Sequence, residues 1–287
     1  MTTTLFQRVT LYLRMIKFSH SIFALPFAFT SALIAASGVP SPRQVFWIVV
    51  AMVGARSGAM GLNRVIDRRI DAANPRTAGR EIPSGVIGVG ETVVFVAVSF
   101  SMMIAAAYML NPLCLYLSPV AILVLFVYSF TKRFTWLAHF VLGLAISAAP
   151  LGSWLAIRGS FYPGILPLVL AVIFWLAGFD VLYALQDLEF DRGHGLYSIP
   201  QRFGVSVSIR LARTFHLIAF LLIAATGLIF GLGPFFWAGM VVVAGLFLYE
   251  HSLVHDDDLS KLDMAFLNMN GYISMTVFIS TLMNYLA

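Results

Sequence analysis

One short stretch of this chain has residue types and a spacing that suit the binding of a cation. Asn63, Asp67 and Asp71 follow one another at intervals of four residues, at the end of a long apolar segment. Because an α-helix has about 3.6 residues per turn, side chains at this spacing lie close to one face. Carboxylates together with the phosphates of a substrate are the ligands that Mg²⁺ prefers. The stretch therefore predicts a divalent-cation site at a helix end.

A second group with the same spacing lies far downstream. Asp187 and Asp191 are four residues apart, and Asp180 and Tyr183 precede them at the end of another apolar run. On one continuous helix these side chains would share a face. We expect the later pair to bind metal and the earlier pair to lie deeper, nearer an organic substrate. Charge is costly inside an apolar run, so two merely solvated acidic loops are the weaker explanation.

Basic residues accompany both groups. Arg56 lies deep in the apolar segment that carries the first group, where it must pair with an anion or line a polar cavity. Its alternative role is an ion pair with Asp180 that only joins two helices. Arg76 and Arg80 follow the first group, and a planar guanidinium suits phosphate oxygens. The Lys132-Arg133 pair could reach a diphosphate or simply anchor a helix end. These residues predict a site for a metal-bridged diphosphate above apolar walls.

The composition is that of an integral membrane protein. Of the 287 residues 60% are hydrophobic and 11% are charged, whereas a soluble domain has about 25% charged residues. Runs of about 20 apolar residues are long enough to span a bilayer. Nine such spans are expected, at residues 18–38, 43–65, 91–110, 112–130, 136–157, 163–186, 211–231, 233–250 and 264–286.

The basic residues also predict the orientation in the membrane. If the N-terminus is cytoplasmic, all but three of the 18 Lys and Arg residues fall on the cytoplasmic side, the exceptions being Arg43, Arg56 and Arg158. Such a bias marks the inside of a membrane protein. Both aspartate groups are then cytoplasmic and the C-terminus is outside, in the inner (cytoplasmic) membrane. The net charge of +5 therefore reflects topology, and no nucleic-acid partner is expected.

These motifs resemble those of the UbiA-type intramembrane prenyltransferases, and the resemblance covers nearly the whole chain. The first family motif has an Asn and two Asp followed by Arg-Thr, Arg and Pro-Ser-Gly, and the second has Tyr and two Asp followed by Gly, Ser and Gly. The matching residues of the first motif are Asn63, Asp67, Asp71, Arg76, Thr77, Arg80, Pro83, Ser84 and Gly85. Those of the second motif are Tyr183, Asp187, Asp191, Gly195, Ser198 and Gly204.

The resemblance implies an all-α integral membrane protein, a single polytopic domain over residues 1–287. Nine transmembrane helices would surround a central cavity under a cytoplasmic polar cap. The implied reaction is the Mg²⁺-dependent transfer of a polyprenyl group from polyprenyl diphosphate to a hydroxylated aromatic carboxylate of the 4-hydroxybenzoate type, in quinone biosynthesis. Diphosphate is released, and membrane lipid surrounds the protein.

Roles follow for individual residues. The expected Mg²⁺ ligands are Asn63, Asp67, Asp71, Asp187 and Asp191. The expected catalytic residues are the same four aspartates with Tyr183. Substrate binding is expected of Arg56, Asn63, Arg76, Arg80, Lys132, Arg133 and Asp180.

Two departures from the family pattern leave the acceptor open. Many members have Asp directly after the first-motif Asn, where this chain has Arg64. The second loop, from Arg192 to Ser198, resembles the branch that prenylates 1,4-dihydroxy-6-naphthoate for menaquinone by the futalosine route. A second alternative is a secondary transporter with carboxylates at a midplane site. Most of the acidic residues lie at helix ends instead, which favours the enzyme.

Overall fold

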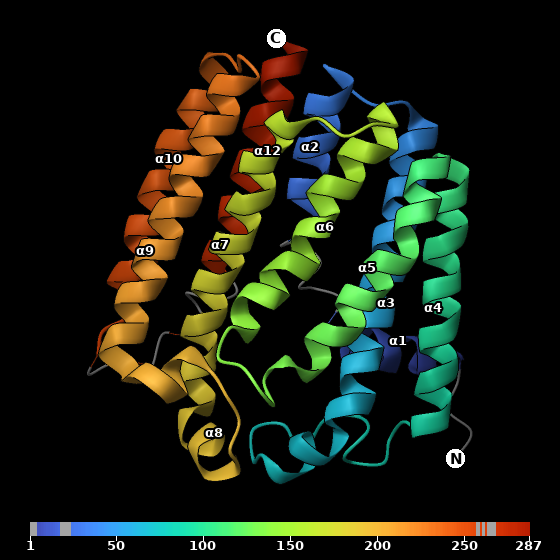
Figure 1. Ribbon diagram of the computed structural model, residues 1–287, viewed down its shortest axis with the longest axis vertical. Helices are drawn as coiled ribbons and strands as arrows, with labels where there is room; N and C mark the ends of the chain where they lie inside the picture. Colours follow the sequence, from blue (N-terminus) through green and yellow to red (C-terminus); the bar gives the residue numbers. More distant parts are fainter. Residues whose placement is uncertain (1–4, 18–23, 257–258, 260–261, 263–267) are drawn as a thin grey trace. The chain divides into compact units, whose positions relative to one another are not determined.

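The computed structural model describes residues 5–17, 24–256, 259, 262 and 268–287, and these residues form helices and connecting loops without a strand (Figure 1). The chain divides into two compact units. The first unit is Met1–Ser21 with Phe46–Phe130, and the second is Ile22–Val45 with Thr131–Ala287.

The described residues of the first unit form four helices, of which α3 begins a few residues before the unit does. They are α1 (Leu5–Met15), α3 (Pro42–Ala73), α4 (Val89–Leu110) and α5 (Pro112–Thr131). The helices of the second unit are α2 (Leu25–Ala36), α6 (Ala138–Arg158), α7 (Leu166–Ala184), α8 (Leu188–His194), α9 (Ile199–Ile229), α10 (Pro234–Ser252) and α12 (Asn270–Leu286). Two 3-10 turns, Pro163–Ile165 and Leu185–Asp187, precede and follow α7.

In the described part of the chain, seven helical segments are long and apolar enough to cross a membrane. They are Pro42–Ala73, Val89–Leu110, Pro112–Thr131, Ala138–Arg158, Pro163–His194, Ile199–Ile229 and Pro234–Ser252. These match seven of the expected spans. The other two, 18–38 and 264–286, begin among residues that lie outside the described ones. The chain is thus a multi-pass, all-helical protein wherever the structure describes it.

Two helices extend well beyond the apolar runs that predict them. Helix α3 continues to Ala73 rather than residue 65, and α9 begins at Ile199 rather than residue 211. Hydropathy locates the part of a helix that suits lipid, whereas charged and polar residues can continue the same helix into water. Helix α9 also contains a kink at Gly204, whose φ of 79° is easily adopted only by glycine.

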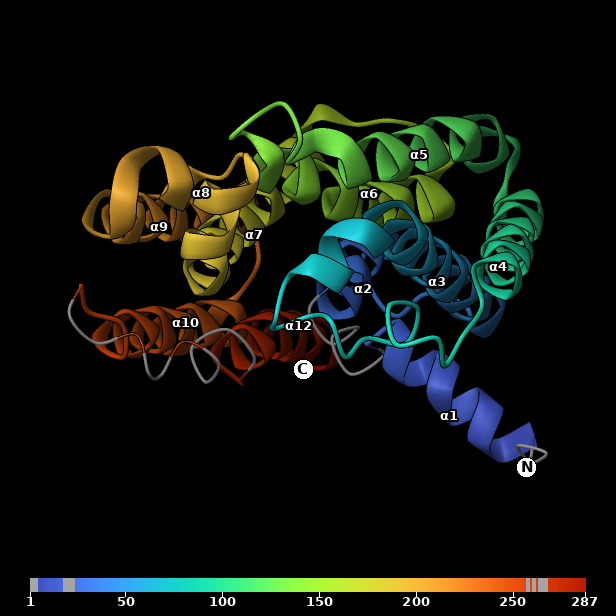
Figure 2. The ribbon, with the colours of Figure 1, turned by 90° about the horizontal axis from the view of Figure 1, so that it is seen from below.

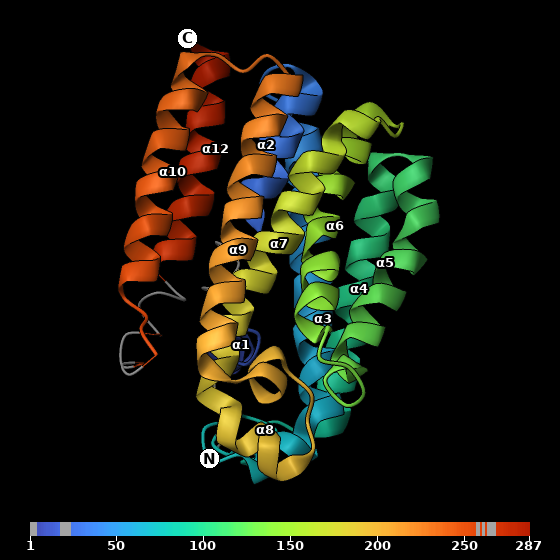
Figure 3. The same cartoon turned by 60° about the vertical axis from the view of Figure 1, so that its left-hand side comes forward.

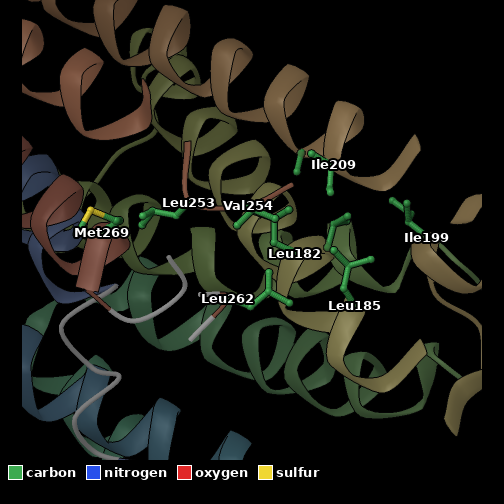
Figure 4. Close-up of a cluster of buried hydrophobic side chains, with 10 residues drawn as sticks. Leu182, Leu185, Ile199, Ile209, Leu253, Val254, Leu262 and Met269 are labelled. Carbon is green, nitrogen blue, oxygen red and sulfur yellow. The ribbon is translucent and has the colours of Figure 1, made fainter. Parts of the chain in front are cut away.

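The second unit is built around α7, a strongly apolar helix, most of whose residues between Leu168 and Leu182 are buried. Helices α6 and α9 pack along it, and α10 lies beside α12 (Figures 2 and 3). A cluster of buried aliphatic side chains fills the space near the end of α7 (Figure 4). It joins Leu182 and Leu185 to Ile199 and Ile209 of α9 and to Val254.

A buried polar cluster joins α9, α10 and α12 in the same unit. His216 lies 3.2 Å through Nε2 from the Trp175 carbonyl and 3.0 Å through Nδ1 from His251 Nε2. A carbonyl can only accept, so Nε2 of His216 carries a proton and donates to Trp175. Asn270 donates to Glu250 Oε1 at 3.1 Å. Hydrogen bonding of this kind offsets the cost of burying polar groups between apolar helices.

Close contact between α6 and α7 depends on one glycine. A Cβ at Gly143 would lie 2.6 Å from the carbonyl oxygen of Ile173 on α7. No real side chain is accommodated at that distance unless the helices separate. Gly143 lies one turn from His139, so the same contact holds that histidine against α7.

We expect Gly143→Ala to lower the free energy of unfolding by about 1 to 3 kcal/mol, because overpacking forces the backbone of α7 to move. The measurement is thermal unfolding of the purified protein in detergent. Gly152→Ala on the same helix is the control, since its Cβ would meet nothing within 4 Å. Equal unfolding temperatures for the two variants would contradict the assigned contact.

Candidate functional site

The first aspartate group lies on the last turns of α3, as the spacing predicts. Asn63 Nδ2 donates a hydrogen bond to Asp67 Oδ2 at 3.1 Å, which places these two side chains on one face of the helix. Asp67 is 1% exposed and Asp71 is 3% exposed. Two carboxylates are therefore buried one turn apart at the end of a membrane-crossing helix.

Guanidinium groups neutralise Asp71. Arg80 NH1 lies 2.7 Å from Asp71 Oδ1, and Arg64 NH1 lies 3.8 Å from Asp71 Oδ2. Thr77 donates to the main-chain oxygen of Asp71 at 2.9 Å. Breaking a buried ion pair by removing one partner is strongly destabilising. These contacts therefore fold the loop after α3 back over the end of the helix.

Two further basic residues of the first unit come before and after this carboxylate group in the sequence. Arg76 is exposed in the loop, where its main-chain N–H donates to Asn74 Oδ1 at 2.9 Å. Arg56 is half-buried and donates through NH2 to the main-chain oxygen of Lys17 at 3.1 Å. Its buried Nε has no hydrogen-bond partner. The hydrogen bond of Arg56 thus goes to the segment that follows α1.

The second aspartate group does not lie on one continuous α-helix, which corrects the sequence-based expectation. Helix α7 ends at Ala184, a 3-10 turn covers Leu185–Asp187, and α8 begins at Leu188. A 3-10 turn has about three residues per turn, so helical offsets across it do not keep one face. Asp187 is the residue that precedes α8, and Tyr183 and Asp187 are both half-buried.

Asp191 is held by the start of α9. Ser198 donates through Oγ to Asp191 Oδ2 at 3.0 Å and accepts the Gln201 N–H at 3.2 Å. The second of these bonds is the usual cap of a helix N-terminus. The neighbouring Tyr197 N–H donates to the main-chain oxygen of Lys132 at 2.7 Å. The Lys132-Arg133 segment therefore lies against the second motif, with both side chains half-buried.

His139 is a residue of this site that the sequence analysis missed. Its Nδ1 lies 2.7 Å from Asp180 Oδ2, and its Nε2 accepts the Ile199 N–H at 3.2 Å. A backbone N–H can only donate, so Nε2 is unprotonated and Nδ1 donates to the carboxylate. His139 is 4% exposed. A single histidine in an apolar run gives no signal that separates this role from plain packing.

The oxygen ligands of the first group fit a hard divalent cation. Asn63, Asp67 and Asp71 offer amide and carboxylate oxygens, the ligand type of Mg²⁺. Asp71 Oδ2 is buried and accepts no hydrogen bond. Among the described residues no group of three or more His, Cys, Asp or Glu side chains is arranged to hold a metal.

Comparison with known proteins gives the same family for almost the whole chain. The model of the UbiA prenyltransferase family matches residues 24–273. A 4-hydroxybenzoate octaprenyltransferase of Vibrio cholerae is 32% identical over 246 residues, 85% of this chain and 86% of that protein. A protein of the same name from Aromatoleum aromaticum is 30% identical over 292 residues, 99% of this chain and 97% of the relative.

Solved structures agree with this fold. The apo structure of a UbiA homolog from Aeropyrum pernix K1 has a TM-score of 0.80 and 28% identity, covering 93% of this chain and 97% of that one. A UbiA homolog from Archaeoglobus fulgidus, bound to DMAPP and Mg²⁺, has a TM-score of 0.72 at 19% identity, covering 96% and 99%. At that identity the second likeness concerns the fold alone. The chain therefore belongs to the UbiA prenyltransferase family and is a membrane-embedded enzyme of the transferase class.

Proposed function

We propose that this enzyme transfers a polyprenyl group from polyprenyl diphosphate to a hydroxylated aromatic carboxylate of the 4-hydroxybenzoate type, in quinone biosynthesis. The observation that carries the proposal is the buried pair Asp67 and Asp71 beside the guanidinium of Arg80, which joins cation ligands to a phosphate-binding side chain. The names of the two curated relatives support the same acceptor.

Both aspartate groups are assigned to the metal and the diphosphate. Mg²⁺ would be held by Asn63, Asp67, Asp71, Asp187 and Asp191. Bound Mg²⁺ supplies positive charge that stabilises the departing diphosphate. UbiA homologs from Archaeoglobus fulgidus bind Mg²⁺ together with DMAPP or GPP, which supports the use of Mg²⁺ in this enzyme.

Basic side chains complete the binding of the diphosphate. Arg76, Arg80, Lys132 and Arg133 would donate to its oxygens. The guanidinium of Arg80 has five N–H donors, so it can keep its contact with Asp71 and also bind a phosphate oxygen. Arginine recognises phosphate through paired, charge-assisted hydrogen bonds, which orient the leaving group as well as bind it.

The chemical step breaks the bond between the first prenyl carbon and the diphosphate oxygen. The electron pair leaves with diphosphate, and the allylic cation that remains is attacked by an electron-rich carbon of the aromatic ring. The ring then loses one proton to a nearby base. Apolar walls exclude water, which would otherwise trap the cation. Asp180, Tyr183 and Arg56 would orient the acceptor, and His139 would hold the carboxylate of Asp180 in one position.

The membrane arrangement follows from the same proposal. Residues 1–287 would form a single polytopic domain with nine transmembrane helices around a central cavity. The N-terminus and the catalytic residues would face the cytoplasm and the C-terminus would be outside. The distribution of Lys and Arg supports this orientation.

One alternative acceptor has a specific observation in its favour. The second motif loop resembles the branch that prenylates 1,4-dihydroxy-6-naphthoate, which would place the enzyme in menaquinone rather than ubiquinone biosynthesis. Both acceptors are hydroxylated aromatic carboxylates, so the reaction is the same. The secondary-transporter alternative has no comparable support, since the family is one of transferases.

We expect membranes that contain the protein to prenylate 4-hydroxybenzoate when Mg²⁺ and a long-chain prenyl diphosphate are present. The assay offers 4-hydroxybenzoate and 1,4-dihydroxy-6-naphthoate in parallel and detects the prenylated product by mass spectrometry. Product from the naphthoate alone would move the enzyme to the menaquinone branch. No product from either acceptor would overturn the proposed function.

Asp67→Asn and Asp191→Asn should each lower kcat by about a hundredfold or more, because each removes a charge that offsets the charge of the metal. The protein should remain folded, as judged by its elution from a sizing column and its thermal unfolding. Glu189→Gln is the control, because Glu189 is exposed and pairs with Arg192 in the same short helix. Full activity of both aspartate variants would exclude their assignment to metal.

His139→Ala should raise the KM for the aromatic acceptor about tenfold, since Asp180 loses the donor that fixes its position. The KM for prenyl diphosphate should change little. Steady-state kinetics with each substrate varied in turn measures both constants. His194→Ala serves as the control, because His194 is exposed and interacts with Phe190 of its own helix. A purely structural role for His139 would instead change both KM values together or neither.

A further inference from the structure

Exposed aromatic and aliphatic side chains gather at the end of the second unit that carries the second motif. Phe134 and Leu137 lie in the segment before α6, and Tyr197 and Phe203 lie at the start of α9, each at least 39% exposed. Trp136 lies among them and is half-buried. We call these five residues the aromatic patch. An exposed apolar surface of this kind marks a place where a protein contacts a membrane or another molecule.

Contacts between the two chain segments make the aromatic patch continuous. The rings of Trp136 and Phe203 meet edge to face, with their centroids 5.4 Å apart. The Tyr197 N–H donates to the main-chain oxygen of Lys132 at 2.7 Å, which brings the two segments side by side. Ring packing and a main-chain hydrogen bond therefore fix the shape of the patch.

One cation lies directly over the aromatic patch. The guanidinium carbon of Arg202 is 5.4 Å from the centre of the Trp136 ring and 5.5 Å from that of the Phe203 ring. Both distances are within the range of a cation–π interaction, which restrains the side chain without neutralising its charge. Arg202 is exposed. Its planar guanidinium can therefore rest on the rings while its N–H groups bind the oxygens of a phosphate.

The kink in α9 explains how Arg202 and Phe203 come to lie beside Trp136. Gly204 has a φ of 79° and a ψ of 175°, which interrupt the helix between Phe203 and the rest of α9. Glycine adopts such a φ at little cost, whereas other residues do not. The first turn of α9, from Ile199 to Phe203, can therefore leave the axis of the long helix and pack against the segment before α6.

The length of α6 locates the aromatic patch at the surface of the bilayer. Helix α6 has 21 residues and is therefore about 30 Å long, the thickness of the hydrocarbon core. Phe134, Trp136 and Leu137 come directly before it. The Ile199 N–H donates to Nε2 of His139 in the first turn of α6 at 3.2 Å, so the start of α9 lies at the same level. Aromatic residues are enriched at this level of membrane proteins.

We propose that Arg202 and the aromatic patch form a binding site for an anionic phospholipid at the surface of the bilayer. The guanidinium donates to the lipid phosphate, and the rings contact the glycerol and the first carbons of the acyl chains. A lipid is favoured over a protein partner because exposed leucines continue the surfaces of the same two helices toward the hydrocarbon, namely Leu144 of α6 and Leu217 and Leu221 of α9. This site goes beyond the proposed reaction and does not depend on it.

The lipid site lies one helical turn from the second motif. The main-chain N–H of Arg202 donates to the main-chain oxygen of Ser198 at 3.1 Å, and the hydroxyl of Ser198 donates to Asp191 at 3.0 Å. A bound lipid therefore stabilises the same turn that positions Asp191. A ligand that binds only the folded protein also raises its unfolding temperature, so occupancy has a readout without turnover.

The test is native mass spectrometry of the full-length protein in detergent, with phosphatidylglycerol or phosphatidylcholine added in increasing amounts. Arg202→Gln should weaken the first phosphatidylglycerol adduct about fivefold, because it removes one cation from the headgroup level. Trp136→Leu should weaken the same adduct about twofold to fivefold, because the guanidinium loses its ring. Phosphatidylcholine adducts should change little in either variant. Thermal unfolding without added lipid checks that each variant is folded.

Arg192→Gln is the matched control, because it removes one exposed positive charge from α8, where Arg192 pairs with Glu189 at 3.3 Å. It should leave phosphatidylglycerol binding within twofold of the wild type. Equal phosphatidylglycerol binding by the wild type and Arg202→Gln would overturn the proposal and leave the aromatic patch to a protein partner. An equal loss in Arg192→Gln would show a general effect of charge and would also overturn it. Binding of glycerol 3-phosphate alone, lost in Arg202→Gln, would assign the site to a soluble phosphate compound instead of a lipid.

Discussion

The side chain of Asp71, at the end of α3, is nearly inaccessible to water. Its negative charge must therefore be compensated by neighbouring groups of the protein. Arg80 and Arg64 provide the compensation at 2.7 and 3.8 Å. Arg80 belongs to the loop that follows α3, so the ion pair folds that loop over the helix end. Arg64 also holds the last turn of α1 through Met15. One buried charge thus brings together three segments of the first unit.

In the second unit, hydrogen bonds rather than arginine side chains stabilise the carboxylates. Asp180 accepts from His139, which accepts in turn from the first N–H of α9. Asp191 accepts from Ser198, the residue that caps the same helix. The N-terminus of α9 therefore positions two carboxylates that come from different helices. The close approach of α6 to α7 at Gly143 keeps the histidine within reach.

Those parts of the fold and the site that depend on periodicity could be predicted from the sequence. Long apolar runs predicted the seven described helical segments that are long and apolar enough to cross a membrane, and the four-residue spacing predicted the shared face of Asn63 and Asp67. The 3-10 turn before α8 could not be predicted, because local sequence gives no clear signal for a change of helix type.

Hydrogen bonds between residues far apart in the sequence could not be predicted for a different reason. The bond between His139 and Asp180 joins residues 41 positions apart, and nothing in either neighbourhood indicates the other. Arg64 stood out in the sequence as a departure from the family motif, but its role depends on the end of α1, 49 positions away. Contacts of this kind arise from packing, which neither spacing nor hydropathy reports.

The central claim is that both aspartate groups bind the cations of one diphosphate substrate. The most direct measurement is electron paramagnetic resonance of Mn²⁺ bound to the protein with a non-hydrolysable prenyl diphosphate analogue, in the wild type and in Asp71→Asn and Asp187→Asn. Loss of bound Mn²⁺ in each variant is the result predicted here. Undiminished Mn²⁺ binding after substitution in either motif would show that the motif holds no metal, and would contradict the account.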